Sequence, residues 1–275
     1  MKRLFIFFAI LVMLGFLALG VGYRNAIADP AVRRVTILMP AWPVGAPAMR
    51  VVLVADIHLG NAVTGASRLA HIVDLINPLS PDLVLIAGDF VAGHERAPGQ
   101  ESAAALAAPL ARLKARFGVV ATLGNHDHWT APDEIADALT RANITVLENT
   151  AAVRGPLVIG GVGDAFTRHD QLGRTRAAMR GLAGVPLILT HSPDIAPDLD
   201  PDVRLLLAGH THCGQIVLPF VGAISTVSRF GERYRCGIRR ERGHIILVTA
   251  GVGTSVLPLR YGAPPDIWLI ELRGR

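Results

Sequence analysis

Cysteine and lysine are scarce in this chain of 275 residues, and aromatic residues make up only 5% of it. The two cysteines cannot build a disulfide framework and form no Cys-x-x-Cys pair. Their number therefore does not indicate whether the protein folds in an oxidising or a reducing compartment. Of the 27 basic residues, only Lys2 and Lys114 are lysines, and the net charge is +5. Because the basic residues are scattered apart from one run, we expect no nucleic acid as a specific partner.

Several classes of enzyme and fold are also excluded by what the sequence does not contain. It has no internal repeat, no Gly-x-Ser-x-Gly elbow, no P-loop and no Gly-x-Gly-x-x-Gly after a strand. With 51% hydrophobic and 18% charged residues, it is neither a disordered chain nor a collagen-like fibre. The length is sufficient for one large domain with a substantial core.

One long apolar run stands near the N-terminus. Residues 4–21 carry no charge, and eighteen helical residues with a rise of about 1.5 Å each extend roughly 27 Å, close to the thickness of a bilayer core. A cleaved signal peptide is the alternative, because Ala26-Ile27-Ala28 has the form of a cleavage site. The run is longer than a usual signal core and Arg24 lies near the cut, so we expect a membrane anchor.

The charges beside this run hardly decide its orientation. Lys2 and Arg3 precede it, whereas Arg24, Arg33 and Arg34 follow it. Both readings of a signal-like segment deliver the rest of the chain outside the cell membrane. We therefore expect a single-pass membrane protein with an exported domain, and a cytoplasmic domain is the alternative.

After the proline-rich stretch 30–47, apolar runs alternate with helical patterns. Spacing of apolar residues predicts helices over 67–77, 101–116 and 132–141. Continuous apolar runs predict strands near 35–39 and over 51–55, 83–87, 119–123, 144–147, 157–159, 187–190, 203–208, 245–249 and 267–272. This alternation predicts one α/β domain with a layered core of sheet and covering helices.

Polar side chains follow five of the predicted buried strands directly, and α/β sheets bind ligands outside the carboxyl ends of their strands. These candidate metal ligands are Asp56, His58, Asp89, Asn125, His191, His210 and His212. In Asp-x-His and His-x-His at an extended strand end, both side chains are expected to point the same way. Gly88, Gly124 and Gly209 precede polar residues and allow tight turns and close approach.

The chemistry of this set indicates a transition-metal site. Carboxylate, imidazole and amide ligands suit Mn, Fe or Zn better than Ca or Mg. Seven candidates are too many for one ion and fit two divalent ions that share a carboxylate.

The order of these motifs resembles the calcineurin-like metallophosphoesterases, in which D-x-H, G-D, G-N-H-D/E, a lone His and G-H-x-H follow one another. The residues Cys213-Gly214-Gln215-Ile216 and the segment from Gly251 to Tyr261 are similar to a narrower group of membrane-anchored bacterial members. The resemblance covers about residues 50–272. It implies an α/β layered sandwich of two mixed β-sheets flanked by helices. With the likeness to bacterial members, the expected location is a bacterial inner membrane with the exported domain in the periplasm, and the cytoplasmic face is the alternative.

The resemblance also implies roles for individual residues. One metal would bind Asp56, His58, Asp89 and His212, and the other Asp89, Asn125, His191 and His210, with Asp89 bridging. His126 would act on the phosphoryl or leaving oxygen, oriented by Asp127. The ions would acidify a water for in-line attack on phosphorus.

The implied activity is that of a membrane-associated phosphoesterase whose substrate is a phosphodiester or a pyrophosphate. A membrane-anchored enzyme would meet lipid-linked forms of such substrates. A hydrolase of the UDP-2,3-diacylglucosamine type in lipid A synthesis is an alternative, although it requires a cytoplasmic domain. A non-catalytic metal-binding scaffold is an alternative of another class. The expected organisation is an anchor or signal segment at 1–22, a juxtamembrane connection at 23–48 and a catalytic domain at 49–275.

Several residues keep more than one interpretation. His94 and Arg260 are candidates for substrate binding, and His128 could face the same cleft, whereas His71, His169 and His244 are expected on the surface or satisfied in the core. Cys213 is expected to be a packed thiol. The basic run is either a solvated hairpin edge or a collar for anionic groups, and it comprises Arg229, Arg233, Arg235, Arg239, Arg240 and Arg242.

Overall fold

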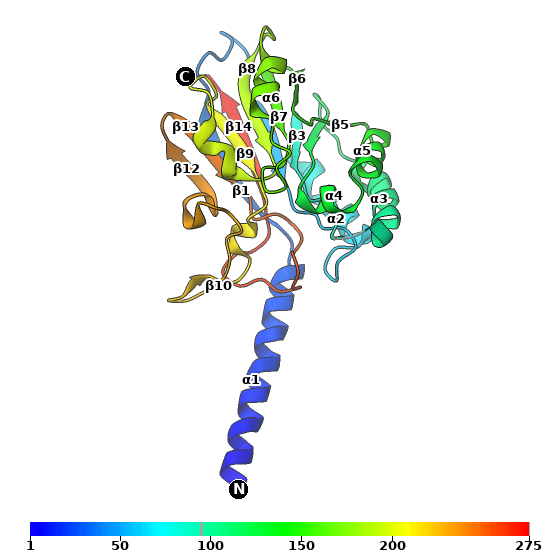
Figure 1. Ribbon diagram of the computed structural model, residues 1–275, viewed down its shortest axis with the longest axis vertical. Helices are drawn as coiled ribbons and strands as arrows, with labels where there is room; N and C mark the ends of the chain where they lie inside the picture. Colours follow the sequence, from blue (N-terminus) through cyan, green and yellow to red (C-terminus); the bar gives the residue numbers. More distant parts are fainter. Residues whose placement is uncertain (94–95, 275) are drawn as a thin grey trace.

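Two six-stranded sheets lie face to face in the computed structural model, which describes residues 1–93 and 96–274 (Figure 1). In the first sheet the order is β1 Ala31–Leu38, β14 Asp266–Arg273, β2 Met49–Val54, β3 Leu83–Ala87, β4 Val119–Thr122 and β5 Ile144–Val146. In the second sheet the order is β12 Gly237–Glu241, β13 His244–Val248, β9 Leu205–Ala208, β8 Val185–Thr190, β7 Leu157–Val162 and β6 Thr150–Arg154. Both sheets are mixed, because β14 runs antiparallel to β2, and β12 and β6 run antiparallel to their neighbours.

The apolar runs form strands because both of their faces are buried. In β3, Leu83 and Leu85 face the second sheet and pack in one core with Leu187 and Leu207 of β8 and β9. The alternate residues of β3 pack in another core with α2 Ala66–Ile76, α3 Arg96–Leu110 and α5 Pro132–Arg141. A continuous apolar sequence is what a strand between two hydrophobic layers requires.

A third core lies on the outer face of the second sheet. It packs that sheet against α6 Leu172–Met179 and the short 3₁₀ helix η2 Pro193–Asp198. The remaining short elements are α4 Asn125–Thr130, η1 Asn77–Leu79, η3 His212–Gly214, η4 Gly231–Tyr234 and the two-stranded hairpin of β10 Val217–Leu218 and β11 Gly222–Ala223. The expected fold class, two mixed sheets flanked by helices, is confirmed.

Helix α1 Lys2–Ile27 projects from the folded part as a single long rod (Figure 1). Its most apolar window has a mean hydropathy of 2.9 and none of it is buried, so by length and composition the helix can cross a membrane. Within the described residues, α1 is buried against the domain in its last turns, at Gly22 and Ala26. The strand β1 that follows pairs in parallel with β14, while the predicted division at 22/23 and 48/49 stays a prediction.

The structure departs from the expected elements where patterns are short or interrupted. The helix expected over 101–116 is α3, which begins earlier at Arg96 and ends at Leu110, directly after Pro109 removes a backbone donor. Among the described α-helices and the strands of five or more residues, four were not expected: β6, β12, α4 and α6. Each has five to eight residues with little periodicity, so sequence pattern gives a weak signal for them.

Candidate metal centre

The predicted ligands lie on turns just beyond the strands. Asp56, His58, Asp89, His210 and His212 all have φ between 48° and 70°, in the left-handed region that side chains rarely adopt. The expectation that extended strand ends would aim the Asp-x-His and His-x-His pairs is therefore wrong, because β2 and β9 end before these residues. Left-handed residues at alternate positions of the two turns aim them instead, and such strain persists where the surrounding fold fixes it.

Two glycines allow the turns to approach one another closely. A Cβ on Gly124 would lie 2.3 Å from Asp89 Oδ1, and one on Gly209 would lie 2.6 Å from Asp56 Oδ2. Any side chain at either position would displace a carboxylate of the centre. The close backbone approach expected at these glycines is confirmed.

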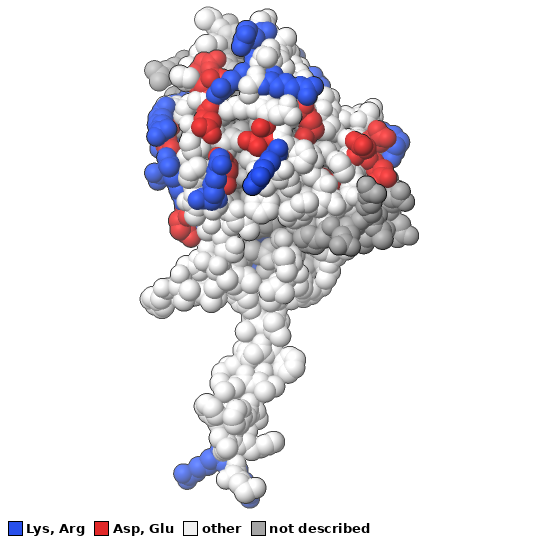
Figure 2. Space-filling model, in the orientation of Figure 1, with Lys and Arg blue, Asp and Glu red and all other residues white. Residues whose placement is uncertain are grey.

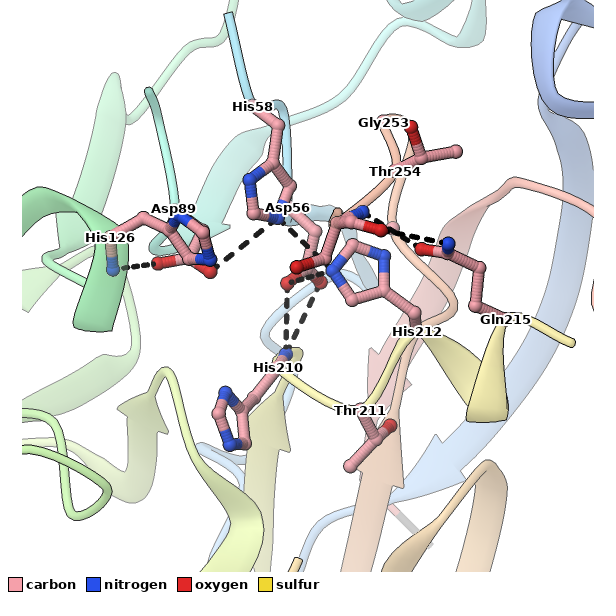
Figure 3. A network of polar contacts seen from close by, with 12 residues as sticks. Asp56, His58, Asp89, His126, His210, Thr211, His212, Gln215, Gly253 and Thr254 are labelled. Carbon is pink, nitrogen blue, oxygen red and sulfur yellow. Dashed lines mark hydrogen bonds and ion pairs between the residues drawn. The ribbon is translucent and has the colours of Figure 1, made fainter. Parts of the chain in front are cut away.

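One half of the centre joins the ends of β2, β3 and β9 (Figure 3). His58 Nε2 lies 3.0 Å from His212 Nε2 and 3.5 Å from Asp89 Oδ2. His212 Nε2 is 3.5 Å from Asp56 Oδ1. All four side chains are buried, and Asp56, His58 and His212 offer ligand atoms within 4.8 Å of one another.

The other half uses the opposite side of Asp89. His191 Nε2 lies 3.2 Å from Asp89 Oδ2, 3.1 Å from Asn125 Oδ1 and 3.1 Å from His210 Nδ1. The other ring nitrogen of His191 is 2.7 Å from the carbonyl oxygen of Ala87, which fixes the ring. The Asp89 oxygen Oδ2 thus lies within reach of both groups, and its predicted role as the shared ligand stays a prediction.

The spacing of these atoms fits bound cations. Two ligand atoms about 2.1 Å from one ion and at right angles are roughly 3.0 Å apart, the separation of the facing imidazole nitrogens. Nitrogen and oxygen donors in this mixture suit Mn, Fe or Zn. The residues present therefore fit a divalent metal centre, and the identity of the metals is not specified by the fold.

Burial keeps most of the imidazoles in the form that binds metal. It lowers the pKa of His58 to about 3 and that of His210 to about 4, and it lowers the pKa of His212 well below its usual value. A neutral imidazole offers a free electron pair to a cation. Burial also raises the pKa of Asp56 to about 8 in the absence of a metal charge.

The loop that carries Asn125 and His126 is held by Asp127. The Asp127 carboxylate accepts hydrogen bonds from the backbone N–H groups of Phe90 (2.8 Å), Val91 (3.2 Å) and Gly124 (2.8 Å). These bonds join the start of α4 to the loop after β3, and the predicted orientation of His126 by Asp127 stays a prediction. The backbone N–H of His126 donates to Asp89 Oδ1 at 2.8 Å, so His126 lies beside the central carboxylate.

Arg260 does not face the substrate side, so its expected role in substrate binding is wrong. Its side chain is fully buried beneath His212, with Nη2 3.3 Å from His212 Nδ1. The guanidinium donates to the backbone carbonyl oxygens of Gly253 (2.6 Å), Ala250 (2.7 Å) and Ala263 (2.9 Å). Arg260 therefore stabilises the loop that carries His212.

The other open candidates lie elsewhere. His94 falls outside the described residues. His128 stacks on His169 with ring centroids 3.9 Å apart and lies 3.5 Å from Glu148. In the basic run, Arg239 and Arg240 lie on β12, an outer strand of the second sheet, and Arg233 pairs with Glu241, as in a solvated hairpin edge.

Cys213 is not the packed thiol that was expected. It forms a disulfide with Cys236, across 23 positions of sequence. The bond ties the loop after His212 to the segment before β12, and Arg235 Nη1 donates to the Cys213 carbonyl oxygen at 2.7 Å. Sequence spacing gave no signal for this pair, because two cysteines that far apart form no recognisable motif.

A pocket of about 340 Å³ opens beside the centre. Its inner wall includes Asp89, Asn125, His126, His210 and His212. Two aromatic residues missed by the sequence analysis, Trp129 and Phe166, form another wall, with ring centroids 5.9 Å apart. The outer wall is apolar and includes Ile224, Val227, Val256 and Leu257.

Comparison with known proteins agrees with the resemblance that the sequence motifs indicate. A family model described as calcineurin-like phosphoesterase matches residues 49–214. A Danio rerio protein named transmembrane protein with metallophosphoesterase domain is 32% identical over 270 residues, which are 92% of this chain and 59% of that protein. The uncharacterized metallophosphoesterase YkuE of Bacillus subtilis is 29% identical over 264 residues, 93% of this chain and 90% of YkuE.

Among solved structures, the nuclease MPE of Pseudomonas putida is similar with a TM-score of 0.38 and 19% identity, covering 80% of this chain and 86% of that one. The present chain spans less than two thirds of the length of the Danio rerio relative. A Caenorhabditis elegans protein named putative metallophosphoesterase F40B5.2 is 30% identical, and the chain covers 56% of it.

Proposed function

Since the chain belongs to the calcineurin-like phosphoesterase family, we propose that it is a membrane-anchored, two-metal phosphoesterase. The observation that carries this proposal is the convergence of seven buried ligand side chains from five separate loops, with Asp89 in the middle of the other six. A scaffold that bound no metal would leave facing imidazole nitrogens and carboxylates without a compensating charge. Three ligands on each side of a shared carboxylate favour two ions.

The chain's own residues position the substrate and move the proton. Two divalent ions bound here would supply an acidic water as nucleophile and would neutralise charge on the phosphoryl group. His126 lines the pocket beside Asp89 and would donate a proton to the leaving oxygen. Asp127 keeps the loop of His126 in place through its bonds to backbone N–H groups.

The contacts of α1 support an anchor that remains part of the protein. The backbone N–H of Arg260 donates to the Gly22 carbonyl oxygen at 3.0 Å, and the Tyr261 hydroxyl donates to that of Ala18. Asn25 Nδ2 donates to the Arg260 carbonyl oxygen at 3.1 Å. Cleavage after Ala28 would remove all three bonds from the segment that supports His212.

The disulfide supports an exported catalytic domain. Disulfides form and persist in oxidising compartments such as the bacterial periplasm and are rare in the cytosol. The bond between Cys213 and Cys236 therefore favours a periplasmic location over the cytoplasmic face of an inner membrane. This argument also disfavours the alternative of a UDP-2,3-diacylglucosamine-type hydrolase, because that role needs a cytoplasmic domain.

The pocket favours a phosphodiester or pyrophosphate that carries a lipid group. Its polar inner wall would hold the phosphoryl group, and its apolar outer wall offers contact for an uncharged substituent. A small anionic monoester would leave the apolar wall without a partner. We therefore place lipid-linked diesters ahead of monoesters.

A substrate panel on the full chain with Mn²⁺ tests this function. We expect hydrolysis of bis(p-nitrophenyl) phosphate to exceed that of p-nitrophenyl phosphate, and we expect Asp89→Ala to abolish both. The matched control His71→Ala changes an exposed histidine outside the centre and should retain full turnover. Absence of turnover of every ester by the metal-loaded wild type would contradict the proposal.

A further inference from the structure

An uncharged, apolar surface lies next to the base of α1. Residues 213–228 and 249–259 contain no Asp, Glu, Lys or Arg. Phe220 is fully exposed, Val256 is 88% exposed and Val221 is 68% exposed. We call this surface the apolar rim, and it consists of Leu218, Phe220, Val221, Ile224, Val256 and Leu257.

The two segments of the rim are fastened to each other. Gln215 Nε2 donates to the carbonyl oxygens of Ser255 (2.9 Å) and Leu257 (3.0 Å), and the Ser255 N–H donates to Gln215 Oε1 at 2.8 Å. The Val217 N–H donates to the Tyr261 carbonyl oxygen at 2.8 Å. The hairpin of β10 and β11 is therefore held against the loop before Tyr261.

The same loop is fastened to α1, and this contact fixes the position of the rim relative to a bilayer that α1 spans. Tyr261 contacts Ala18, and a Cβ on Gly22 would lie 2.6 Å from the Tyr261 ring. Ala18 lies within the last turn of the uncharged run 4–21, at the end where a spanning helix leaves the hydrocarbon region. Tyrosine is enriched at that boundary of a bilayer.

The distribution of charge agrees with a rim that lies at the boundary of the bilayer. In the view of Figure 2, few coloured side chains show at the end of the folded part from which α1 emerges, and most of the visible Lys, Arg, Asp and Glu residues of the folded part lie farther from α1. Figure 1 shows the hairpin of β10 projecting beside the upper part of α1. An exposed apolar patch continuous with a membrane segment is the expected form of an interfacial contact.

We propose that the apolar rim docks on the lipid bilayer and holds the mouth of the metal-centre pocket at the membrane surface. This rests on the proposed anchoring by α1. Ile224, Val256 and Leu257 belong both to the rim and to the pocket wall, so the apolar path from the bilayer to the centre is continuous. A lipid-linked ester reaches the centre along this wall without its acyl chain crossing water.

Tryptophan quenching by brominated phosphatidylcholine tests the docking in vesicles that contain the full chain. Phe220→Trp places the probe on the rim, and Val44→Trp places it at an equally exposed site on the loop before β2. Figure 1 shows this loop at the end of the domain away from α1. Phe8→Trp places the probe inside α1. With the wild-type signal subtracted, we expect quenching of roughly half or more of the added fluorescence at positions 8 and 220 and almost none at 44.

The outcomes separate this proposal from the proposed function. Quenching at Phe8→Trp without quenching at Phe220→Trp overturns the docking and leaves the anchor intact. A blue-shifted but unquenched Phe220→Trp also overturns it, since a second copy or another protein would then cover the rim. Quenching at neither position refutes both the docking and the anchor.

A kinetic measurement gives an independent test. Phe220→Asp should leave turnover of soluble bis(p-nitrophenyl) phosphate unchanged, while turnover of a lipid phosphodiester in the vesicles should fall about tenfold or more. Val44→Asp, the matched control, should change neither. Equal turnover of the vesicle substrate by Phe220→Asp and the wild type would overturn the proposal, whereas absence of all turnover in the wild type would instead refute the proposed function.

Discussion

Removal of the disulfide between Cys213 and Cys236 should destabilise the domain by a calculable amount. The bond closes a loop across 23 positions of sequence. The loss of chain entropy in the unfolded state for a loop of this length is about 3 kcal/mol. For a domain of roughly this size, that difference lowers the melting temperature by about 6–12 °C. His212 directly precedes Cys213, so we expect the variant to lose metal more readily.

The assay compares the full chain and the double variant Cys213→Ser/Cys236→Ser in detergent micelles, with thermal unfolding followed by circular dichroism. Dithiothreitol should lower the melting temperature of the wild type to that of the variant, and it should leave the variant unchanged. An unreduced wild type with two titratable thiols would refute the reasoning, as would a variant that melts at the wild-type temperature.

Two further predictions concern the leaving-group residue and the base of α1. His126→Ala should retain its metals and lose roughly 10²–10⁴-fold in turnover of an aryl diester, because a proton donor is removed; metal analysis that shows a loss of bound ions would instead make His126 a ligand. Gly22→Leu should lower the melting temperature by several degrees, since overpacking against Tyr261 costs about 1–3 kcal/mol. Gly20→Leu has the same change in helix propensity, and a Cβ added there would meet no described atom within 4 Å apart from its own stretch of helix. An equal shift in both variants would therefore contradict the contact.

Much of the fold was predictable because its strands are buried on both faces. The five residues of β3 are apolar without interruption and were expected at the bounds observed. The limits of α5 were also expected as observed, because Pro132 begins the helix and its apolar residues recur at helical spacing. Edge strand β6 has no buried residue, and its Thr-Ala-Ala-Val-Arg sequence shows neither a continuous apolar run nor an alternation of apolar and polar residues.

The candidate site was predictable in its membership more than in its geometry. Ordered motifs placed Asp56, Asp89 and His191 at strand ends, and the structure brings them together. The left-handed turns that aim the side chains have no signature in periodicity, because they arise from close contact with neighbouring loops. Arg260 looked like a substrate ligand because it is charged and near the motifs, and only tertiary structure reveals the carbonyl oxygens that surround it.

Metal content of the full chain tests the central claim most directly. After loading with Mn²⁺ and removal of free ions, mass spectrometry should find about two ions per wild-type chain and a marked loss in Asp89→Ala, because that substitution removes the shared carboxylate. Asp133→Ala, an exposed carboxylate on α5, should retain the wild-type content. A wild type with one ion or none, or an Asp89→Ala variant that keeps both ions, would contradict the account.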